Sequence, residues 1–172
     1  MISTARLVLR PPHPGDAAAI TALMTPAISR WLGTWPASLT VPMATERIEG
    51  LLRANSAGTA FSCLIEHGRQ IAGYIGCDLS PETNKASLGY WLGKPHQHQG
   101  LMLEAAPPFV ETAHAALKFE TIEAVAQPSN RGSFAVMAAC GLAPVGRRTH
   151  WTPSRQRHEQ VELWRRTWPL SA

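Results

Sequence analysis

A glycine-bearing loop between an apolar run and a helical pattern is the part of this sequence best suited to chemistry. The apolar run covers residues 86–92, the loop passes through Gly93 and Gly100, and the helical pattern begins at Leu101. Backbone N–H groups at the start of a helix have no intrahelical partner, and the helix dipole adds partial positive charge there. The sequence therefore predicts an anion site in this loop, and phosphate is the usual guest of such loops.

Three further sets of side chains are candidates for chemistry. Glu104 follows the loop and could act as a base, although the helix dipole alone explains a carboxylate in a first turn. Ser133 has a hydroxyl that could take part in chemistry or could instead bond a carbonyl one turn earlier in its helix. His96 and His98 lie two residues apart, but no His, Cys or Asp at metal-ligand spacing accompanies them, so we predict no metal site.

The composition favours a folded cytoplasmic protein. A chain of 172 residues, 45% of them hydrophobic, can bury a core, and we expect one domain over residues 1–172. The formal charge of +4 suits an anionic ligand but is too small to predict nucleic-acid binding. No run is long enough to span a membrane, and the scattered Cys63, Cys77 and Cys140 fit a reducing compartment without disulfides.

Hydrophobic periodicity predicts an alternation of strands and helices. Strands are expected at residues 5–10, 59–66, 71–79, 86–92, 121–127, 144–151 and 161–168. Helices are expected at residues 17–24, 45–55, 101–118 and 130–140, the first of them capped by Asp16. Short turns join the strands between residues 59 and 92, whereas a long helix precedes the strand at 121–127. We therefore predict an α/β (α+β) fold with a mixed, mostly antiparallel central sheet flanked by helices.

Two groups of tryptophans have open interpretations. Trp31 and Trp35 lie between two predicted helices, where they could line a substrate pocket or simply pack in the core. Trp151, Trp164 and Trp168 belong to the predicted C-terminal hairpin, which could form the interface of a homodimer.

Several stretches of the chain together resemble one known family. They are Arg6–Pro11 with Asp16-Ala17, Gly89–Gly93, Gln97–Met102 with Glu104-Ala105, and Asn130–Ser133 with Cys140–Leu142. In this order and spacing they are similar to the GNAT family of acetyl-CoA-dependent N-acetyltransferases. The greatest similarity is to the branch of RimJ/RimL-type enzymes, which act on the N-termini of ribosomal proteins. The resemblance extends over nearly the whole chain and implies the fold of this family.

The resemblance implies a sheet that is splayed at one pair of strands, with the pantetheine arm of acetyl-CoA in the gap. Backbone N–H groups of the loop would hold the pyrophosphate; the residues are Gln97, His98, Gln99, Gly100, Leu101 and Met102. A free N–H at Leu92 or Gly93 would stabilise the oxyanion. Asn130 would bond the pantetheine arm, and Ser133 would lie near the sulfur and protonate the departing thiolate.

The sequence departs from the family pattern at several positions. His98 stands where Gly is common and would be strained at a positive φ, and Met102 stands where Gly or Ala is frequent. Pro107-Pro108 would kink the long helix unless they lie in its first turn. Many members place a Tyr on or just after the Asn-x-x-Ser helix, but here Tyr74 and Tyr90 both precede the loop.

Two functions are compatible with these residues. The first is transfer of an acetyl group from acetyl-CoA to a primary amine by direct attack, the acceptor being a protein or peptide N-terminus or a small amine. The second is a divergent module that keeps the fold and binds acyl-CoA or a peptide without catalysis. Acidic residues could form a rim for a cationic amine or could simply be solvated; they are Glu46, Glu49, Glu82 and Glu159.

Overall fold

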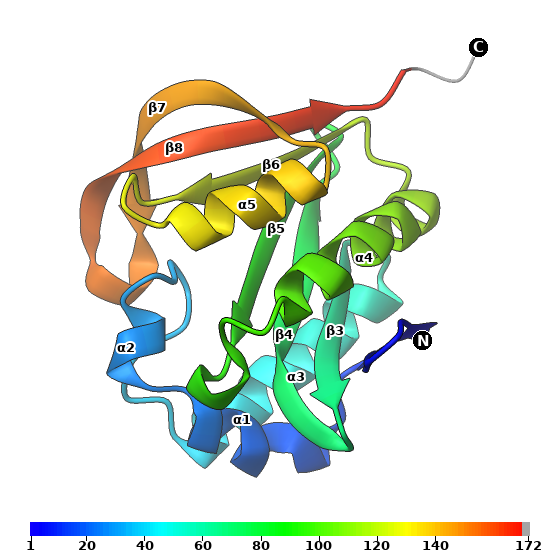
Figure 1. Ribbon diagram of the computed structural model, residues 1–172, viewed down its shortest axis with the longest axis vertical. Coiled ribbons are helices and arrows are strands. Elements are labelled where there is room, and N and C mark those ends of the chain that lie inside the picture. The colour runs from blue at the N-terminus through cyan, green and yellow to red at the C-terminus, as the bar shows by residue number, and fades with distance from the viewer. Residues whose placement is uncertain (170–172) are drawn as a thin grey trace.

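The computed structural model describes residues 1–169 and contains a mixed sheet with helices on both faces (Figure 1). The strands are β1 (Ile2–Ser3), β2 (Leu7–Arg10), β3 (Ala60–His67), β4 (Gln70–Ser80), β5 (Lys85–Leu92), β6 (Thr121–Ala126), β7 (Ala143–Thr152) and β8 (Arg157–Thr167). They lie in the order β1-β2-β3-β4-β5-β6-β8-β7, and every neighbouring pair is antiparallel except β5 and β6. The predicted mixed, mostly antiparallel sheet is therefore confirmed.

Helices cover both faces of this sheet. They are α1 (Ala17–Leu23), α2 (Pro26–Ser29), α3 (Val41–Ser56), α4 (Leu101–Leu117) and α5 (Arg131–Ala139). Short 3-10 turns lie at Pro14–Asp16, Lys94–His96 and Pro153–Arg155. α4 and α5 pack on one face, whereas α1 and α3 pack on the other. The parallel pair β5 and β6 is joined by α4, as the predicted strand-helix-strand crossover requires.

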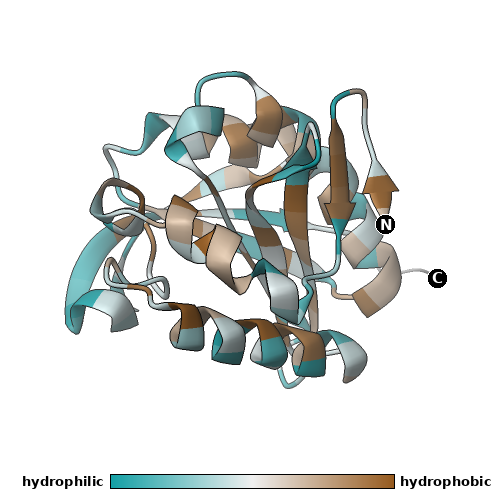
Figure 2. Ribbon diagram, turned by 90° about the horizontal axis from the view of Figure 1, so that it is seen from below, coloured by the Kyte–Doolittle hydropathy of each residue, from teal (hydrophilic) through white to brown (hydrophobic). Residues whose placement is uncertain are grey.

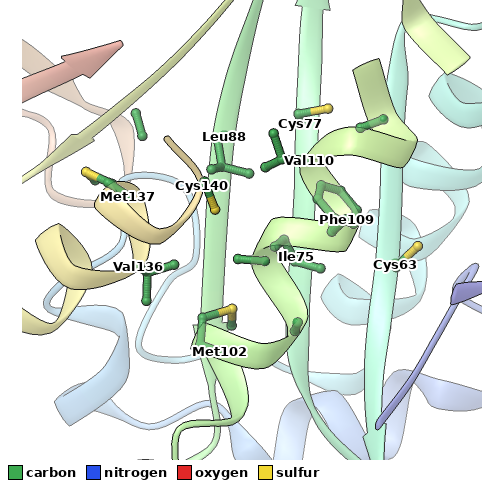
Figure 3. Close-up of a cluster of buried hydrophobic side chains, with 14 of the residues drawn as sticks. Cys63, Ile75, Cys77, Leu88, Met102, Phe109, Val110, Val136, Met137 and Cys140 are labelled. Atoms are coloured by element: carbon green, nitrogen blue, oxygen red, sulfur yellow. The ribbon is translucent and has the colours of Figure 1, made fainter. Parts of the chain in front are cut away.

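The larger core lies between the sheet and the helices α4 and α5 (Figure 3). Alternate residues of β5, including Ala86 and Leu88, point to this side, as the two-residue period of a strand requires. From α4, Phe109 and Val110 are fully buried against the strands. Burial of each such side chain contributes about 1.5–3 kcal/mol, so this apolar stripe fixes α4 over the sheet.

A second core covers the opposite face of the sheet and contains Trp35. The ring of Trp35 is buried, with its centroid 5.3 Å from that of Tyr74 and 5.2 Å from that of Trp91. Trp35 is therefore a core residue and not the wall of a pocket. Trp31 is half-buried, and the guanidinium of Arg30 lies 4.4 Å from the centre of its ring. Figure 2 shows the hydrophobic residues concentrated on the strands between the helices.

The start of α1 differs from the expectation. Asp16 precedes the helix, but its side chain makes no capping bond. The carboxylate instead accepts hydrogen bonds from the Arg10 guanidinium at 2.8 Å and from the His13 N–H at 2.7 Å. Asp16 therefore occupies the predicted N-cap position without capping the helix through its side chain, because a guanidinium on the preceding strand binds the carboxylate oxygens.

The helix α3 begins earlier than the predicted start at Thr45. Thr40 caps it, since the Thr40 hydroxyl accepts a hydrogen bond from the Met43 N–H at 3.4 Å. Pro42 lies in the first turn, where the missing N–H is not needed. The proline thus marks the start of this helix.

The C-terminal hairpin is also longer than predicted, because β8 begins at Arg157 and not at Val161.

The prolines of α4 lie in its interior and not in its first turn. Pro107 and Pro108 lack the N–H groups that would bond the carbonyls of Leu103 and Glu104. The helix nevertheless continues from Leu101 through both prolines. Buried residues on either side of the prolines hold the helix against the sheet despite the missing bonds.

The close pairing of β4 and β5 leaves no room for a side chain at Gly73. A Cβ there would collide with the Trp91 carbonyl oxygen and would lie 2.9 Å from the Leu92 Cα. We expect Gly73→Ala to lower the free energy of unfolding by about 1–3 kcal/mol, as overpacking does, in urea denaturation. Gly89→Ala is the control, because nothing lies within 4 Å of a Cβ at Gly89. Equal stabilities of the two variants would contradict this expectation.

Candidate active site

The two parallel strands separate at one end. β5 and β6 pair only over residues 85–87 and 121–123. Beyond these residues β5 continues beside β4 to Leu92, whereas β6 continues beside β8 to Ala126. The strands therefore diverge into a V (Figure 1), and the predicted splay at this pair is confirmed.

Hydrogen bonding determines which groups of β5 face the gap. The Gly93 N–H donates to the Ala72 carbonyl at 2.8 Å, so β4 already uses it. Because antiparallel residues alternate between bonded and non-bonded positions, the N–H and C=O of Leu92 point away from β4, toward the gap. The Leu92 carbonyl accepts a bond from the Gln97 side chain at 2.9 Å, whereas its N–H has no partner strand. The expectation for Gly93 was therefore wrong, and Leu92 is the available donor.

The loop after β5 presents free backbone donors at the start of α4. No group of residues 1–169 accepts a hydrogen bond from the N–H groups of residues 98–103. His98 has a φ of 60° and Gly100 a φ of 74°, so both are left-handed, and no side chain caps the helix. The strain expected at His98 is present and costs about 1–2 kcal/mol. Free N–H groups and the helix dipole together make this loop suited to an anion.

Glu104 is held by the N-terminal segment. Its carboxylate accepts hydrogen bonds from the Thr4 hydroxyl at 2.5 Å, the Arg6 N–H at 2.8 Å and the Arg6 guanidinium at 2.7 Å. These bonds lower the pKa of Glu104 to about 2, and the bond from Thr4 has the largest effect. A carboxylate with such a pKa is a poor base at neutral pH. The carboxylate anchors α4 to the N-terminal segment through these bonds, and they do not support the predicted catalytic role of Glu104.

Ser133 lies opposite a tyrosine that sequence reasoning missed. The Tyr90 hydroxyl lies 3.0 Å from the Ser133 carbonyl, to which it can donate, and 2.8 Å from the Ser133 hydroxyl. Burial raises the pKa of Tyr90, so its hydroxyl stays protonated at neutral pH. Asn130 caps α5, because its side-chain oxygen accepts a bond from the Ser133 N–H at 3.3 Å. In the described part of the chain, Ser133 bonds Tyr90 and not the carbonyl one turn earlier.

The two-residue period of β5 was a signal that could have found Tyr90. Leu88 and Leu92 are its neighbours at that period, so the three side chains share the face that packs beneath α4 and α5. Many members of the family that the sequence resembles place a tyrosine on or just after the helix that carries Ser133, and this chain has none there. Strand alternation instead places a tyrosine on the sheet directly across from that helix.

The C-terminal hairpin packs against the segment that follows α2. Arg155 donates to the carbonyl of Ser29 at 3.2 Å and to that of Leu32 at 2.9 Å. Glu159 binds the Arg155 guanidinium through both carboxylate oxygens, at 2.9 and 2.6 Å, and binds Arg157 at 2.7 Å. Glu159 is therefore neither the solvated residue nor the free acidic rim considered from the sequence, because two guanidinium groups neutralise it.

A cavity of about 570 Å³ opens at the carboxyl end of β6, where that strand is splayed from β5. Its lining residues are Gln127, Pro128, Ser129, Arg157, His158, Glu159 and Gln160. The Gln127 amide also donates to the Arg30 carbonyl at 3.1 Å, which joins this cavity to the segment after α2. The cavity therefore lies between the end of β6 and the beginning of β8, beside the helix cap at Asn130.

These parts suit the transfer of an acyl group from a phosphorylated carrier to a nucleophile. The loop can bind a diphosphate, and the unpaired edge of β5 can bond the amides of an extended arm. The Ser133 hydroxyl, which is hydrogen-bonded to that of Tyr90, can supply a proton to a leaving group. Within residues 1–169, no group of three His, Cys, Asp or Glu side chains could hold a metal ion. No helix in this range is long and apolar enough to cross a membrane.

A family model described as an acetyltransferase (GNAT) domain matches residues 6–143. The chain therefore belongs to this family: it is an N-acetyltransferase, with acetyl-CoA as its co-substrate. The uncharacterized N-acetyltransferase p20 of Bacillus licheniformis is 25% identical to it over 147 residues, which cover 83% of this chain and 82% of that protein.

Solved structures share the fold over almost the whole chain. The microcin C7 self-immunity acetyltransferase MccE, solved with acetyl-CoA and AMP, has a TM-score of 0.84 at 18% identity, covering 95% of this chain and 93% of its own. RimL, a ribosomal L7/L12 alpha-N-protein acetyltransferase solved with coenzyme A, has a TM-score of 0.80 at 20% identity, covering 95% of each chain. At identities this low, the structural match shows a common fold. The predicted similarity to the RimJ/RimL-type branch is therefore confirmed at the level of the fold.

Glu159 makes stability depend on pH. The hydrogen bond from Arg155, more than that from Arg157, lowers the pKa of Glu159 from 4.5 to about 2. Because the folded-state pKa lies below the unfolded value, the ionised carboxylate stabilises the fold above pH 4.5, and this contribution is lost as the pH falls toward 2. We expect Glu159→Gln to be less stable than the wild type at pH 7 and to lose less stability between pH 4.5 and 2, in thermal unfolding. A variant with the wild-type pH profile would contradict this assignment.

Proposed function

We propose that this N-acetyltransferase binds the pyrophosphate of acetyl-CoA in the loop before α4 and the pantetheine arm in the gap between β5 and β6. The observation that supports the proposal most strongly is the run of unpartnered N–H groups at residues 98–103, directly after the splayed end of β5. Such a run needs an acceptor, and pyrophosphate oxygens can supply several at one place.

The contacts to the cofactor divide between backbone and side chains in this proposal. The Leu92 N–H bonds the thioester carbonyl and stabilises the oxyanion. Asn130 uses its side-chain oxygen to cap Ser133, so its NH2 group is left to bond a carbonyl of the pantetheine arm. The side chains of Gln97 and Gln99 bond the carbonyls of Leu92 and Pro95, and thereby hold the loop in place.

Ser133 is the proposed proton donor to the thiolate. The neutral amine attacks the thioester carbon, the C–S bond breaks when the tetrahedral intermediate collapses, and the sulfur takes the Ser133 proton. The amine nitrogen loses one proton, which passes through water and restores the Ser133 hydroxyl. The single proton of the Tyr90 hydroxyl can shift from the Ser133 carbonyl to the Ser133 hydroxyl oxygen, which frees the Ser133 proton to turn toward the sulfur. Burial keeps Tyr90 protonated, so it supports Ser133 through a hydrogen bond and does not give up its own proton.

The proposed acceptor is the primary amine of a protein or peptide N-terminus or of a small molecule. The depression at Gln127 is open to solvent, so an acceptor of either kind can approach it. RimL, which shares the fold, is an alpha-N-protein acetyltransferase, and this favours an N-terminus as the acceptor.

We also propose one domain over residues 1–172. A single sheet supports this proposal, because it contains both β1, from the beginning of the sequence, and β8, from near its end. We propose a cytoplasmic location as well, and the free, buried cysteines support it.

The hairpin β7–β8 is the proposed surface for a homodimer. β7 is an edge strand, and its Val145 and Trp151 side chains are 52% and 47% exposed. Trp164 and Trp168 do not support this interface, because both stack inside their own chain. Trp164 stacks on Phe134, and Trp168 stacks on a histidine of α4. Of the three tryptophans considered from the sequence, Trp151 is the one that faces outward.

A binding module without catalysis is the second candidate, and one observation favours it. Glu104, next to the loop, and Glu159, in the cavity, are both bound by arginine and have pKa values of about 2. Neither can readily take a proton from an ammonium group. Release of CoA from acetyl-CoA on addition of an N-terminal peptide or a small amine distinguishes the two candidates, because the module would bind acetyl-CoA without turnover.

Acetyl-CoA binding, measured by calorimetry, tests the loop directly. Leu103→Pro removes one free N–H from the first turn of α4, at a side chain that is 45% exposed. We expect the variant to bind acetyl-CoA about ten- to a hundredfold more weakly, because a hydrogen bond to a charged group is worth about 1.5–3 kcal/mol. Leu103→Ala keeps the N–H and should bind like the wild type. Equal affinities of the two variants would argue against backbone recognition at this turn.

The hydroxyl pair is tested by the rate of CoA release. We expect Ser133→Ala to lower kcat about 10²- to 10⁴-fold, the usual contribution of a general acid, and Tyr90→Phe to lower it less. Tyr74→Phe is a matched control, because the Tyr74 hydroxyl bonds Ser62 at 3.1 Å in the core on the opposite face. A Ser133→Ala variant with the wild-type kcat would exclude Ser133 as the proton donor.

A further inference from the structure

Arg6 connects the N-terminal segment, the loop and the first turn of α4. Its Nε donates to the Glu104 carboxylate at 2.7 Å, and its Nη1 donates to the Gln99 carbonyl at 3.0 Å. The Arg6 N–H and the Thr4 hydroxyl donate to the same carboxylate. The Arg6 Nη2 lies 3.7 Å from the position that a Cβ of Gly100 would occupy. The guanidinium is thus fixed at the point where the loop becomes a helix.

The bond to the Gln99 carbonyl determines where the next N–H points. The C=O of Gln99 and the N–H of Gly100 belong to one planar peptide and point in opposite directions. With the carbonyl held by Arg6, the Gly100 N–H is directed to the other side of the loop. That N–H has no partner among residues 1–169 and belongs to the run of free donors.

The conformation of this loop requires support from outside the loop. Its left-handed residues, His98 and Gly100, and the absence of a side-chain cap give it little intrinsic stability. The glutamine side chains of the loop bond the carbonyls of Leu92 and Pro95, which lie on the side of β5. Arg6 holds the loop from a different segment of the chain, on the side of α4.

We propose that Arg6 is a positioning residue for pyrophosphate binding. It fixes the peptide between Gln99 and Gly100 and thereby directs an N–H toward the phosphate, an inference that rests on the proposed function of the loop. The Arg6 side chain is 45% exposed, and an exposed ion pair such as that with Glu104 adds only about 0–1 kcal/mol to stability. Removing the guanidinium should therefore affect cofactor binding more than folding.

The test compares acetyl-CoA with S-acetylpantetheine, which carries the thioester without the pyrophosphate. We expect Arg6→Gln to reduce about tenfold the ratio of the two affinities, measured by calorimetry and competition. Arg166→Gln is a matched control, because Arg166 also bonds a glutamate of α4 and a backbone carbonyl. Its guanidinium donates to the Glu111 carboxylate at 2.6 Å and to the Cys140 carbonyl at 3.0 Å. The control should keep the wild-type ratio.

Other results would overturn the proposal. If Arg6→Gln weakens the binding of both ligands equally, or of neither, Arg6 does not act through the pyrophosphate. A wild type that shows no preference for acetyl-CoA would instead overturn the proposed function of the loop, and this inference with it. Arg6→Lys provides a second variant if Arg6→Gln fails to fold. It keeps the charge but lacks the planar fork that bonds Glu104 and Gln99 in a fixed geometry, so its ratio should fall to an intermediate value, and a wild-type ratio would contradict the proposal.

Discussion

The loss of pairing between β5 and β6 is the constraint on which the rest of the site depends. A closed sheet would satisfy the Leu92 N–H within the protein and leave no edge for an extended ligand. β5 stays paired with β4, and β6 stays paired with β8. The sheet therefore opens between β5 and β6 while the strands on each side of the gap remain hydrogen-bonded. The crossover through α4 then places a helix N-terminus at the open end of the V. The gap and the anion site therefore arise from one connection.

The parts of this arrangement that could be predicted are local in sequence. The meander β3–β4–β5, the crossover helix and the helix that follows Asn130 could be predicted from apolar periodicity and turn residues within short windows. The contacts that sequence reasoning missed join distant positions. Arg6 and Glu104 are 98 residues apart, and Tyr90 and Ser133 are 43 apart. The alternation along β5 indicates which face Tyr90 occupies but not its partner, and no local pattern pairs Arg6 with Glu104. The bond from Arg10 to Asp16 was missed for a different reason: the two residues are only 6 apart, but a capping pattern does not show which donor takes the carboxylate oxygens.

The acidic residues near the gap illustrate how chemistry inferred from residue type can fail. Glu104 and Glu159 have the position expected of a base and of an acidic rim, respectively. Each is instead bound by arginine: Glu104 by Arg6, 98 residues earlier in the chain, and Glu159 by Arg155, 4 residues earlier. Their low pKa values follow from those bonds, so the same contacts that make them useful anchors make them poor bases. The proposed chemistry accordingly depends on hydroxyl groups and backbone donors.

A site made of backbone N–H groups tolerates changes of side chain but not changes of peptide orientation. This distinction explains how His98 and Met102 can stand where the family commonly has smaller residues, since the donors are unaffected by the side chains that flank them. A residue other than glycine is strained in the left-handed conformation of His98, and groups that hold the loop must offset this strain. Side-chain bonds from both sides of the loop provide this hold. The residues that matter most for binding the anion are therefore expected to be those that orient the peptides, including residues that never touch the ligand.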